Sequence, residues 1–275
     1  MKSPDEKALR GIRLIAADMD NTLLTSQGAL PPDFNRCVPA LDALGITVVI
    51  ASGRALYTLE AFFASLIPHM SFISDNGGLI SHKGTMLFRD LLKVGAYHEM
   101  IRFVQDETDG IPILCGMTEA YAPEQHRRYE AYLRYFYSKI TFVSNLADLA
   151  VEANKFTVYF PQKNSKTWYE THFKAKYGGD FSVTLGDTVW IDIMNFGVHK
   201  GKALQTLGAR LGIRTEQMMA FGDHYNDKEM LQSVHYSYIV ANAPEDMRQY
   251  ARFLADSNDN FGVIKVIEQV LQSHR

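Results

Sequence analysis

The chain has 275 residues, of which 47% are hydrophobic and 21% charged, and its formal net charge is −3. This composition is typical of a folded globular protein, and it excludes extended disorder and a broad basic surface for nucleic acid or an anionic membrane. The length exceeds that of one ordinary domain, so we expect two domains. A small diffusible molecule is the expected partner, while the oligomeric state has no signal in the sequence.

The cysteines and the apolar segments restrict the class of protein further. Cys37 and Cys115 are far apart, so their spacing fits neither a disulfide framework nor a thiolate metal site. The first ten residues carry Asp5, Glu6 and Lys7 and do not resemble a signal peptide. No uncharged apolar stretch approaches the roughly 18 to 20 residues of a membrane-spanning helix. We expect two buried thiols and a cytoplasmic, reducing location.

Short apolar runs alternate with helical patterns in the first third of the chain. The expected order is strand, helix, strand, helix and strand, at residues 14–17, 32–44, 47–51, 56–66 and 71–74. The strands are almost continuously apolar, which is typical of parallel strands covered by helices on both faces. This third therefore predicts an α/β domain.

The middle of the chain differs in character, because aromatic and β-branched strands dominate between longer helices. Strands are expected at 155–160, 181–185 and 189–193, with a hairpin turn at Gly186 and Asp187. Linker-like stretches occur near residues 82–84 and 195–198. We interpret residues 82–195 as an α+β unit that is inserted into a core formed by residues 1–81 and 196–275.

The last third returns to the pattern of the first. Helices and strands are expected at residues 202–211, 218–221, 227–233 and 236–240, in the order helix, strand, helix, strand. Pro244 suits the first turn of a helix through Arg252. A final helix is expected at residues 262–272.

Two carboxylates follow the first predicted strand. Asp18 and Asp20 are two residues apart, at the carboxyl end of a parallel strand, where ligands of open α/β sheets bind. One carboxylate can attack phosphorus and form an acyl phosphate, while its neighbour transfers protons. The alternative is that both residues cap a turn, and this motif alone does not exclude it.

A second acidic group, Gly222-Asp223-His224-Tyr225-Asn226-Asp227, follows the strand at 218–221 and reaches the same edge of the sheet. The two groups together offer hard oxygen ligands that suit Mg²⁺, which also binds water and substrate phosphate. Taken alone, the segment could equally be a polar helix start with Asn226 or Asp227 as N-cap.

Phosphate also needs hydrogen-bond donors. Ser52-Gly53-Arg54, after the strand at 47–51, offers a hydroxyl, an unobstructed amide and the start of a helix. Lys200, at the start of another predicted helix, offers an ammonium for the phosphoryl oxygens and the nucleophile. Each residue alone could be a cap or a solvated charge, but their occurrence with both acidic motifs favours a site.

These motifs, in this order, resemble those of the haloacid dehalogenase superfamily, and specifically its Cof-type branch (subfamily IIB). Ser52-Gly53-Arg54, Asn76-Gly77 and Asn242-Ala243 match the narrower branch. The resemblance implies a Rossmann-like α/β core, with a mainly parallel sheet, and an inserted α+β cap of the C2B type that selects the substrate. The match spans nearly the whole chain.

The resemblance also implies roles for single residues. Asp18 would be the nucleophile and Asp20 the general acid and base. Mg²⁺ would be held by Asp18, the Asp20 carbonyl and Asp223, with Asp227 behind a metal-bound water. The implied phosphate-binding residues are Thr22, Ser52, Gly53, Arg54, Lys200 and Asn226.

Two features depart from the motifs or compete with them. Asn21 stands where many relatives have glycine, and asparagine tolerates the left-handed backbone that a tight turn requires. Residues 125–128, Gln-His-Arg-Arg, precede aromatic residues in a pattern that could indicate nucleic-acid binding. The helical spacing of those aromatics favours a buried stripe beneath a solvated face instead.

The sequence thus predicts a Mg²⁺-dependent hydrolase of small phosphorylated metabolites, with sugar phosphates as the favoured class. A sugar-phosphate mutase or other phosphotransferase could use the same residues, since the aspartyl phosphate would pass to a hydroxyl instead of water. A ligand-sensing protein is the alternative outside the enzymes, and loss of a motif residue would indicate it. No such loss is visible in the sequence.

Overall fold

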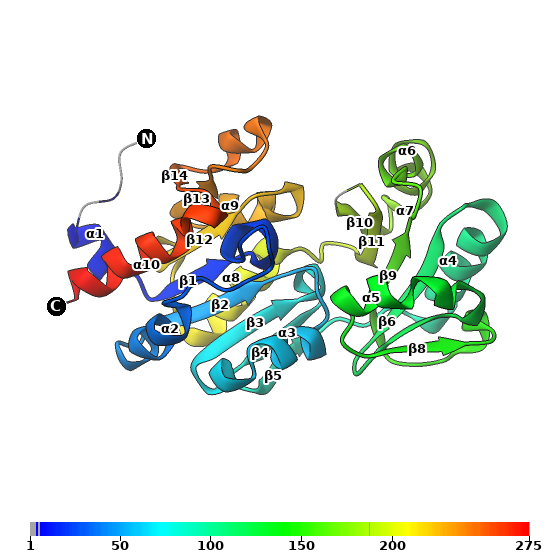
Figure 1. Ribbon diagram of the computed structural model, residues 1–275, viewed down its shortest axis with the longest axis horizontal. Helices are drawn as coiled ribbons and strands as arrows, with labels where there is room; N and C mark the ends of the chain where they lie inside the picture. Colours follow the sequence, from blue (N-terminus) through cyan, green and yellow to red (C-terminus); the bar gives the residue numbers. More distant parts are fainter. Residues whose placement is uncertain (1–3, 5, 187, 275) are drawn as a thin grey trace. The chain divides into compact units, whose positions relative to one another are not determined.

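The computed structural model describes residues 4, 6–186 and 188–274 and divides into two compact units (Figure 1). The first unit takes the chain up to Gly53, Phe63–Leu87 and the chain from His199 onward. The second takes Arg54–Phe62 and Phe88–Val198. The expected insertion at 82–195 therefore begins six residues before the start of this long segment, and it ends three residues before the end of the segment.

The first unit is built on an eight-stranded sheet with the order β14-β13-β12-β1-β2-β3-β4-β5. The strands from β14 to β3 are parallel, and β4 pairs antiparallel with β3. Their bounds are β1 Leu14–Ala17, β2 Thr47–Ala51, β3 Met70–Ser74, β4 Leu79–His82, β5 Thr85–Arg89, β12 Met218–Gly222, β13 Tyr236–Val240 and β14 Phe253–Ala255. The expected bounds of β1, β2 and β13 are confirmed.

Helices cover both faces of this sheet (Figure 1). The helices α2 and α10 pack together on one face, and α8 and α9 pack together on the other. The bounds are α1 Glu6–Arg10, α2 Phe34–Ala43, α8 Lys200–Leu211, α9 Lys228–Ser233 and α10 Gly262–Ser273. Because α8 begins two residues earlier than expected, Lys200 lies on the helix itself.

Two parts of the first unit differ from the sequence-based expectation. The expected linker at 82–84 is the turn of the β4–β5 hairpin, where Lys83 and Gly84 take positive φ angles of 49° and 80°. The expected helix from Pro244 through Arg252 is a 3₁₀ helix, Glu245–Tyr250, followed by strand β14. Backbone pairing of Phe253–Ala255 with β13 extends the sheet and ends the helix.

The second unit contains a six-stranded sheet with the order β10-β11-β9-β6-β7-β8. Its strands are β6 Ile111–Gly116, β7 Ala120–Pro123, β8 Ile140–Val143, β9 Ala153–Tyr159, β10 Phe181–Gly186 and β11 Trp190–Asn195. Neighbouring strands pair antiparallel, except that β7 and β8 are parallel. The expected pairing of the strands at 181–185 and 189–193 is confirmed, while Asp187 of their turn lies outside the described residues.

Each face of this second sheet packs against a separate apolar cluster. The face that carries Phe156 and Ile191 packs on the helices α4 Val94–Glu107 and α7 Lys174–Tyr177. The other face packs on the segment of helix α5, Glu130–Phe136. Ala55 and Tyr57, at the start of helix α3 Leu56–Phe62, also join that second cluster. The remaining short helix, α6, spans Ser165–Trp168.

Other expectations are tested by burial. Cys37 and Cys115 are both buried free thiols, as expected. In α5, Leu133 is fully buried, whereas Tyr132 is 40% exposed, so the expected aromatic stripe is buried only in part. No helix among the described residues is long and apolar enough to cross a membrane.

We predict that Gly201→Ala destabilises the protein, because a Cβ atom there would lie within 2.5 Å of the Glu229 carbonyl carbon. The loss should be about 1–3 kcal/mol and should lower the thermal midpoint by several degrees. Gly95→Ala is the matched control, since both glycines are the second residue of a helix and the Cβ of Gly95 would meet no atom within 4 Å. Equal midpoints for the two variants would contradict this packing.

Candidate active site

Two neighbouring parallel strands bring acidic residues together where they end. Asp18 follows β1 and Asp223 follows β12, and Ala17 is in register with Phe221. The Asp18 amide donates a hydrogen bond of 3.0 Å to the Phe221 carbonyl, which continues the pairing by one residue. The two predicted acidic groups therefore meet at one edge of the sheet, as the strand order requires.

Lys200 joins this pair from the first turn of α8. Its Nζ atom donates to Asp18 Oδ1 at 2.5 Å and to Asp227 Oδ1 at 2.7 Å, and the side chain is 0% exposed. Burying an ammonium ion is unfavourable unless charged partners hold it, and here two carboxylates do so. Lys200 is thus fixed against the predicted nucleophile.

Asp227 is held on both of its carboxylate oxygens. Oδ1 accepts from Lys200, while Oδ2 accepts the backbone amides of Asp223 at 3.0 Å and His224 at 3.2 Å. These bonds fold the loop after β12 around its carboxylate. The structure therefore gives Asp227 a role that the sequence did not indicate, in orienting Lys200 and Asp223.

The turn after Asp18 has the left-handed backbone conformation that the sequence suggested for Asn21. Asn21 has a φ angle of 59°, in the left-handed region, and its carbonyl accepts a 2.8 Å hydrogen bond from Asn242 Nδ2. Asp20 is half-buried at this turn. Thr22 is buried, and its hydroxyl donates to Asp223 Oδ1 at 2.9 Å. Thr22 therefore contacts the acidic group directly.

A second loop carries the predicted phosphate-binding residues Ser52 and Gly53. The Ser52 amide donates to the Ile73 carbonyl at 2.8 Å, and the Ser52 carbonyl accepts from the Asn76 amide at 3.0 Å. Asn226 Nδ2 donates to Asn76 Oδ1 at 3.2 Å. A Cβ atom on Gly53 would lie 3.2 Å from that same oxygen, so glycine leaves room for the Asn76 side chain.

Asn76 was noted in the sequence as part of an Asn-Gly pair, but no role followed from it. In the structure it connects the loops of Ser52 and Asn226, and it has a φ angle of 55°. Gly77, with φ of 110°, passes so close to α8 that a Cβ atom would lie 2.7 Å from the His199 carbonyl oxygen. The Asn-Gly pair itself was the signal, since both residue types tolerate positive φ.

Arg54, predicted to bind phosphate, is engaged within the second unit. Its guanidinium donates to the Tyr135 carbonyl at 3.2 Å and lies 4.8 Å from the centre of the Tyr135 ring. The Phe136 ring is also within cation–π range, at 5.6 Å. These contacts join Arg54 to the segment of α5 within the second unit.

The electrostatics of the acidic group favour a bound cation. Burial, and then repulsion by Asp227, raise the pKa of Asp18 well above its ordinary value, although Lys200 opposes the rise. Burial and Asp227 likewise raise the pKa of Asp223 to about 7. Burial lowers the pKa of Lys200, but attraction by Asp18 and Asp227 outweighs it and raises the value overall. One ammonium therefore leaves the three carboxylates with excess negative charge.

The carboxylates of Asp18, Asp223 and Asp227 offer oxygen atoms that all lie within 4.8 Å of one another. Hard oxygen donors with a net negative charge suit a divalent cation such as Mg²⁺. Because both oxygens of Asp227 already accept hydrogen bonds, Asp18 and Asp223 are the better direct ligands. The residues present therefore fit the expected metal.

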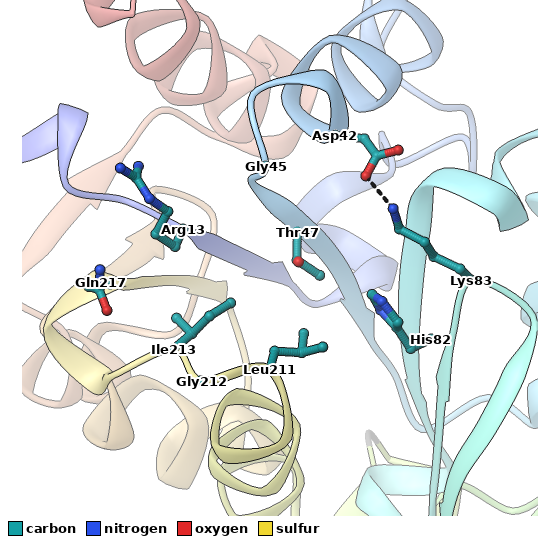
Figure 2. A pocket seen from close by; sticks show the side chains of 10 residues that line it. All are labelled: Arg13, Asp42, Gly45, Thr47, His82, Lys83, Leu211, Gly212, Ile213 and Gln217. Atoms are coloured by element: carbon teal, nitrogen blue, oxygen red, sulfur yellow. Dashed lines mark hydrogen bonds and ion pairs between the residues drawn. The ribbon is translucent and has the colours of Figure 1, made fainter.

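A pocket of about 490 Å³ lies beside the amino ends of β1, β2 and β12, opposite the ends that carry the acidic residues (Figure 2). It is lined by Arg13, Asp42, Gly45, Thr47, His82, Lys83, Leu211, Gly212, Ile213 and Gln217. Its carboxylate, Asp42, is already paired with Lys83 at 2.7 Å and with His69 at 2.9 Å. Helices α2 and α8 end here, and helix C-termini repel phosphate. The pocket lacks the group of carboxylates that the acidic residues after β1 and β12 provide.

We predict that Lys200→Met destabilises the protein by about 3–5 kcal/mol, because the buried carboxylates lose their counter-charge. The loss should be larger at pH 8 than at pH 5, since protonation relieves the repulsion that remains. Lys202→Met, on an exposed position of the same helix, is the control and should change little. Thermal unfolding measures the stability of both variants. Equal shifts of the thermal midpoint would show that Lys200 does not provide the counter-charge for the buried carboxylates.

Comparisons with known proteins identify the group to which this site belongs. The model of the haloacid dehalogenase-like hydrolase family matches residues 15–267. The 5-amino-6-(5-phospho-D-ribitylamino)uracil phosphatase of Escherichia coli is 29% identical over 263 residues, which cover 95% of this chain and 97% of that enzyme.

Solved structures show the same fold over more than nine-tenths of the chain. SMU.1108c from Streptococcus mutans is 29% identical, with a TM-score of 0.88, and the match covers 95% of this chain and 99% of that one. The subclass IIB sugar phosphatase BT4131 has a TM-score of 0.77 at 17% identity, over 93% and 98% of the two chains. The protein has the Rossmann-like core and additional α+β unit of this fold, and it belongs to the haloacid dehalogenase-like hydrolases, as an enzyme of the phosphatase type.

Proposed function

We propose that the protein is a Mg²⁺-dependent phosphomonoester hydrolase that acts on a small phosphorylated metabolite through an aspartyl phosphate on Asp18. The observation that carries the proposal is the buried contact of Lys200 with Asp18, beside Asp223 on the neighbouring strand. An ammonium at 2.5 Å favours the anionic form of Asp18 and so opposes the effects of burial and of Asp227 on its pKa.

The reaction takes two steps at Asp18. Its carboxylate oxygen forms a bond to phosphorus as the bond from phosphorus to the leaving oxygen breaks, and Asp20 gives that oxygen a proton. Asp20 then takes a proton from water, whose oxygen attacks the phosphoryl group and releases phosphate and free Asp18. Asp20 is half-buried and lies two residues after Asp18 on the same turn, which supports a role in proton transfer beside the nucleophile.

The neighbouring residues hold the phosphoryl group and the metal. The residues proposed to bind the phosphoryl oxygens remain Thr22, Ser52, Gly53, Arg54, Lys200 and Asn226. Asp18, Asp223 and the Asp20 carbonyl are proposed to hold Mg²⁺. When bound, the cation neutralises charge on the phosphoryl oxygens and on Asp18.

The names of two relatives suggest the substrate class. One acts on a phosphoribityl derivative of uracil, and the other is a sugar phosphatase. Both substrates join a phosphate to a chain of hydroxyl groups, so we propose a sugar or polyol phosphate here. The second unit is proposed to select it, as a cap does in this fold. We propose a cytoplasmic location, as expected from the sequence.

We predict that the purified protein releases phosphate from sugar and polyol phosphates with Mg²⁺, and that EDTA stops the release. Asp18→Asn should reduce phosphate release to the background rate, and Asp20→Asn should lower kcat by about 10²–10⁴-fold. Asp33→Asn, at an exposed carboxylate, is the control for charge removal and should retain full activity.

Phosphate release and isomer formation must be measured in the same reaction mixtures. Full activity of Asp18→Asn would refute the nucleophile. Isomerisation of a sugar phosphate without phosphate release would show a mutase instead of a hydrolase.

A further prediction concerns pH and the metal. Because the pKa of Asp223 is raised to about 7 without a metal, protons compete with Mg²⁺ below that pH. The dissociation constant for Mg²⁺ should therefore rise by up to about tenfold from pH 7 to pH 6. The metal-free protein should also lose stability as pH rises from about 4 to 7, since folding favours the protonated Asp223.

Calorimetric titration at pH 6, 7 and 8 measures this affinity, and thermal unfolding measures the linked stability. Mg²⁺ should raise the thermal midpoint more at pH 8 than at pH 6. Asp223→Asn should bind the ion weakly at every pH. An affinity that does not vary over this range would contradict the role of Asp223.

A further inference from the structure

The pair Asn242-Ala243 is a motif of the sequence that the proposed reaction does not use. Asn242 lies two residues after strand β13, at the carboxyl end of that strand. Strand β13 pairs parallel with β12, and β12 pairs parallel with β1, so the loops after all three strands leave the same edge of the sheet. Asn242 therefore lies at the edge where the acidic residues gather.

The side-chain amide of Asn242 joins two other loops of this edge. Its Nδ2 donates to the Asn21 carbonyl at 2.8 Å, and its Oδ1 accepts the Asn258 backbone amide at 3.0 Å. Asn258 is buried, and its own Nδ2 donates to the Leu24 carbonyl at 2.9 Å. The turn at residues 19–24, which carries Asp20, is thus bonded to the loops after β13 and β14.

The turn that these bonds hold has an unfavourable backbone. Asn21 has a φ angle of 59°, in the left-handed region. Asp20, directly before it, has φ of −79° and ψ of 130°, an extended conformation inside a helical segment. Such backbone persists only where surrounding contacts fix it, and it occurs preferentially at active sites. The bond from Asn242 fixes the peptide group that follows Asn21, and so it restricts the positions open to Asp20.

We propose that Asn242 is a positioning residue for Asp20. The inference rests on the proposed function, in which Asp20 protonates the leaving oxygen. Proton transfer requires heavy atoms within about 2.6–3.2 Å, so a small displacement of Asp20 slows it. Asp18 is held separately, by Lys200 and by the bond of its amide to the Phe221 carbonyl. Loss of the Asn242 amide should therefore impair proton transfer and spare nucleophilic attack.

The variant Asn242→Ala separates these two events when kcat/KM is measured on two substrates at saturating Mg²⁺. One substrate is the sugar or polyol phosphate that the wild type hydrolyses best, whose alkoxide leaving group needs a proton. The other is p-nitrophenyl phosphate, whose phenolate leaving group is stable without one. The kcat/KM should fall about 10- to 100-fold on the first substrate and less than about threefold on the second.

The double variant Asn242→Ala with Asp20→Asn tests whether Asn242 acts through Asp20. In the Asp20→Asn background the added substitution should change kcat/KM by less than about twofold, because the group that it positions is already lost. Asn35→Ala, at an exposed position of α2, is the matched control and should retain wild-type values on both substrates. The thermal midpoint of Asn242→Ala should stay within about 2 °C of the wild type, since Asn242 is exposed.

An equal loss of kcat/KM on both substrates would overturn the proposal, because Asn242 would then support the whole loop and not Asp20 in particular. Additive losses in the double variant would overturn it as well. Failure of the proposed function gives a different result. The wild type would then hydrolyse neither substrate, or Asp20→Asn would keep wild-type kcat/KM on both, and this inference would fail with it.

Discussion

The active site depends on one buried cation. Lys200 is 0% exposed and bonds to carboxylates from two different loops, Asp18 after β1 and Asp227 after β12. Without this ammonium, the ionised forms of Asp18 and Asp223 would lose their counter-charge, and burial and repulsion by Asp227 already raise the pKa values of both groups. The fold therefore places the first turn of α8 beside the carboxyl ends of β1 and β12.

The same bonds connect stability to chemistry. Asp227 orients Lys200 with one oxygen and fixes two backbone amides of the Asp223 loop with the other. Thr22 ties Asp223 back to the loop that carries Asp18 and Asp20. The proposed nucleophile, its counter-ion and a proposed metal ligand are thus held by these hydrogen bonds, and preorganised charges of this kind account for much of enzymatic rate enhancement.

The sequence predicted the parts of the fold that local patterns determine. The continuously apolar strands β1, β2 and β13 have the expected bounds, since burial on both faces leaves a clear signal. Strands β5 and β14 were missed because they are sheet-edge strands with exposed residues, as Met86 and Leu254 show at 40% and 49% exposure. Their pairing depends on strands that are already in place.

For the site, motif order placed Asp18, Asp223 and Lys200 correctly at one edge of the sheet, because parallel strands end together. The sequence could not show that Asp227 holds Lys200, or that Asn76 connects two loops, since both contacts join segments distant in the chain. The contact of Arg54 with the carbonyl and ring of Tyr135, 81 residues away, could not be predicted for the same reason.

The most direct test of the account is chemical trapping of the aspartyl phosphate. The protein is mixed with Mg²⁺ and its best substrate, quenched, and reduced with borohydride, which converts an acyl phosphate of aspartate to homoserine. The account predicts homoserine at position 18, found by peptide mass spectrometry, and none when substrate is omitted. Phosphate release with an unmodified Asp18, or homoserine at another aspartate, would contradict it.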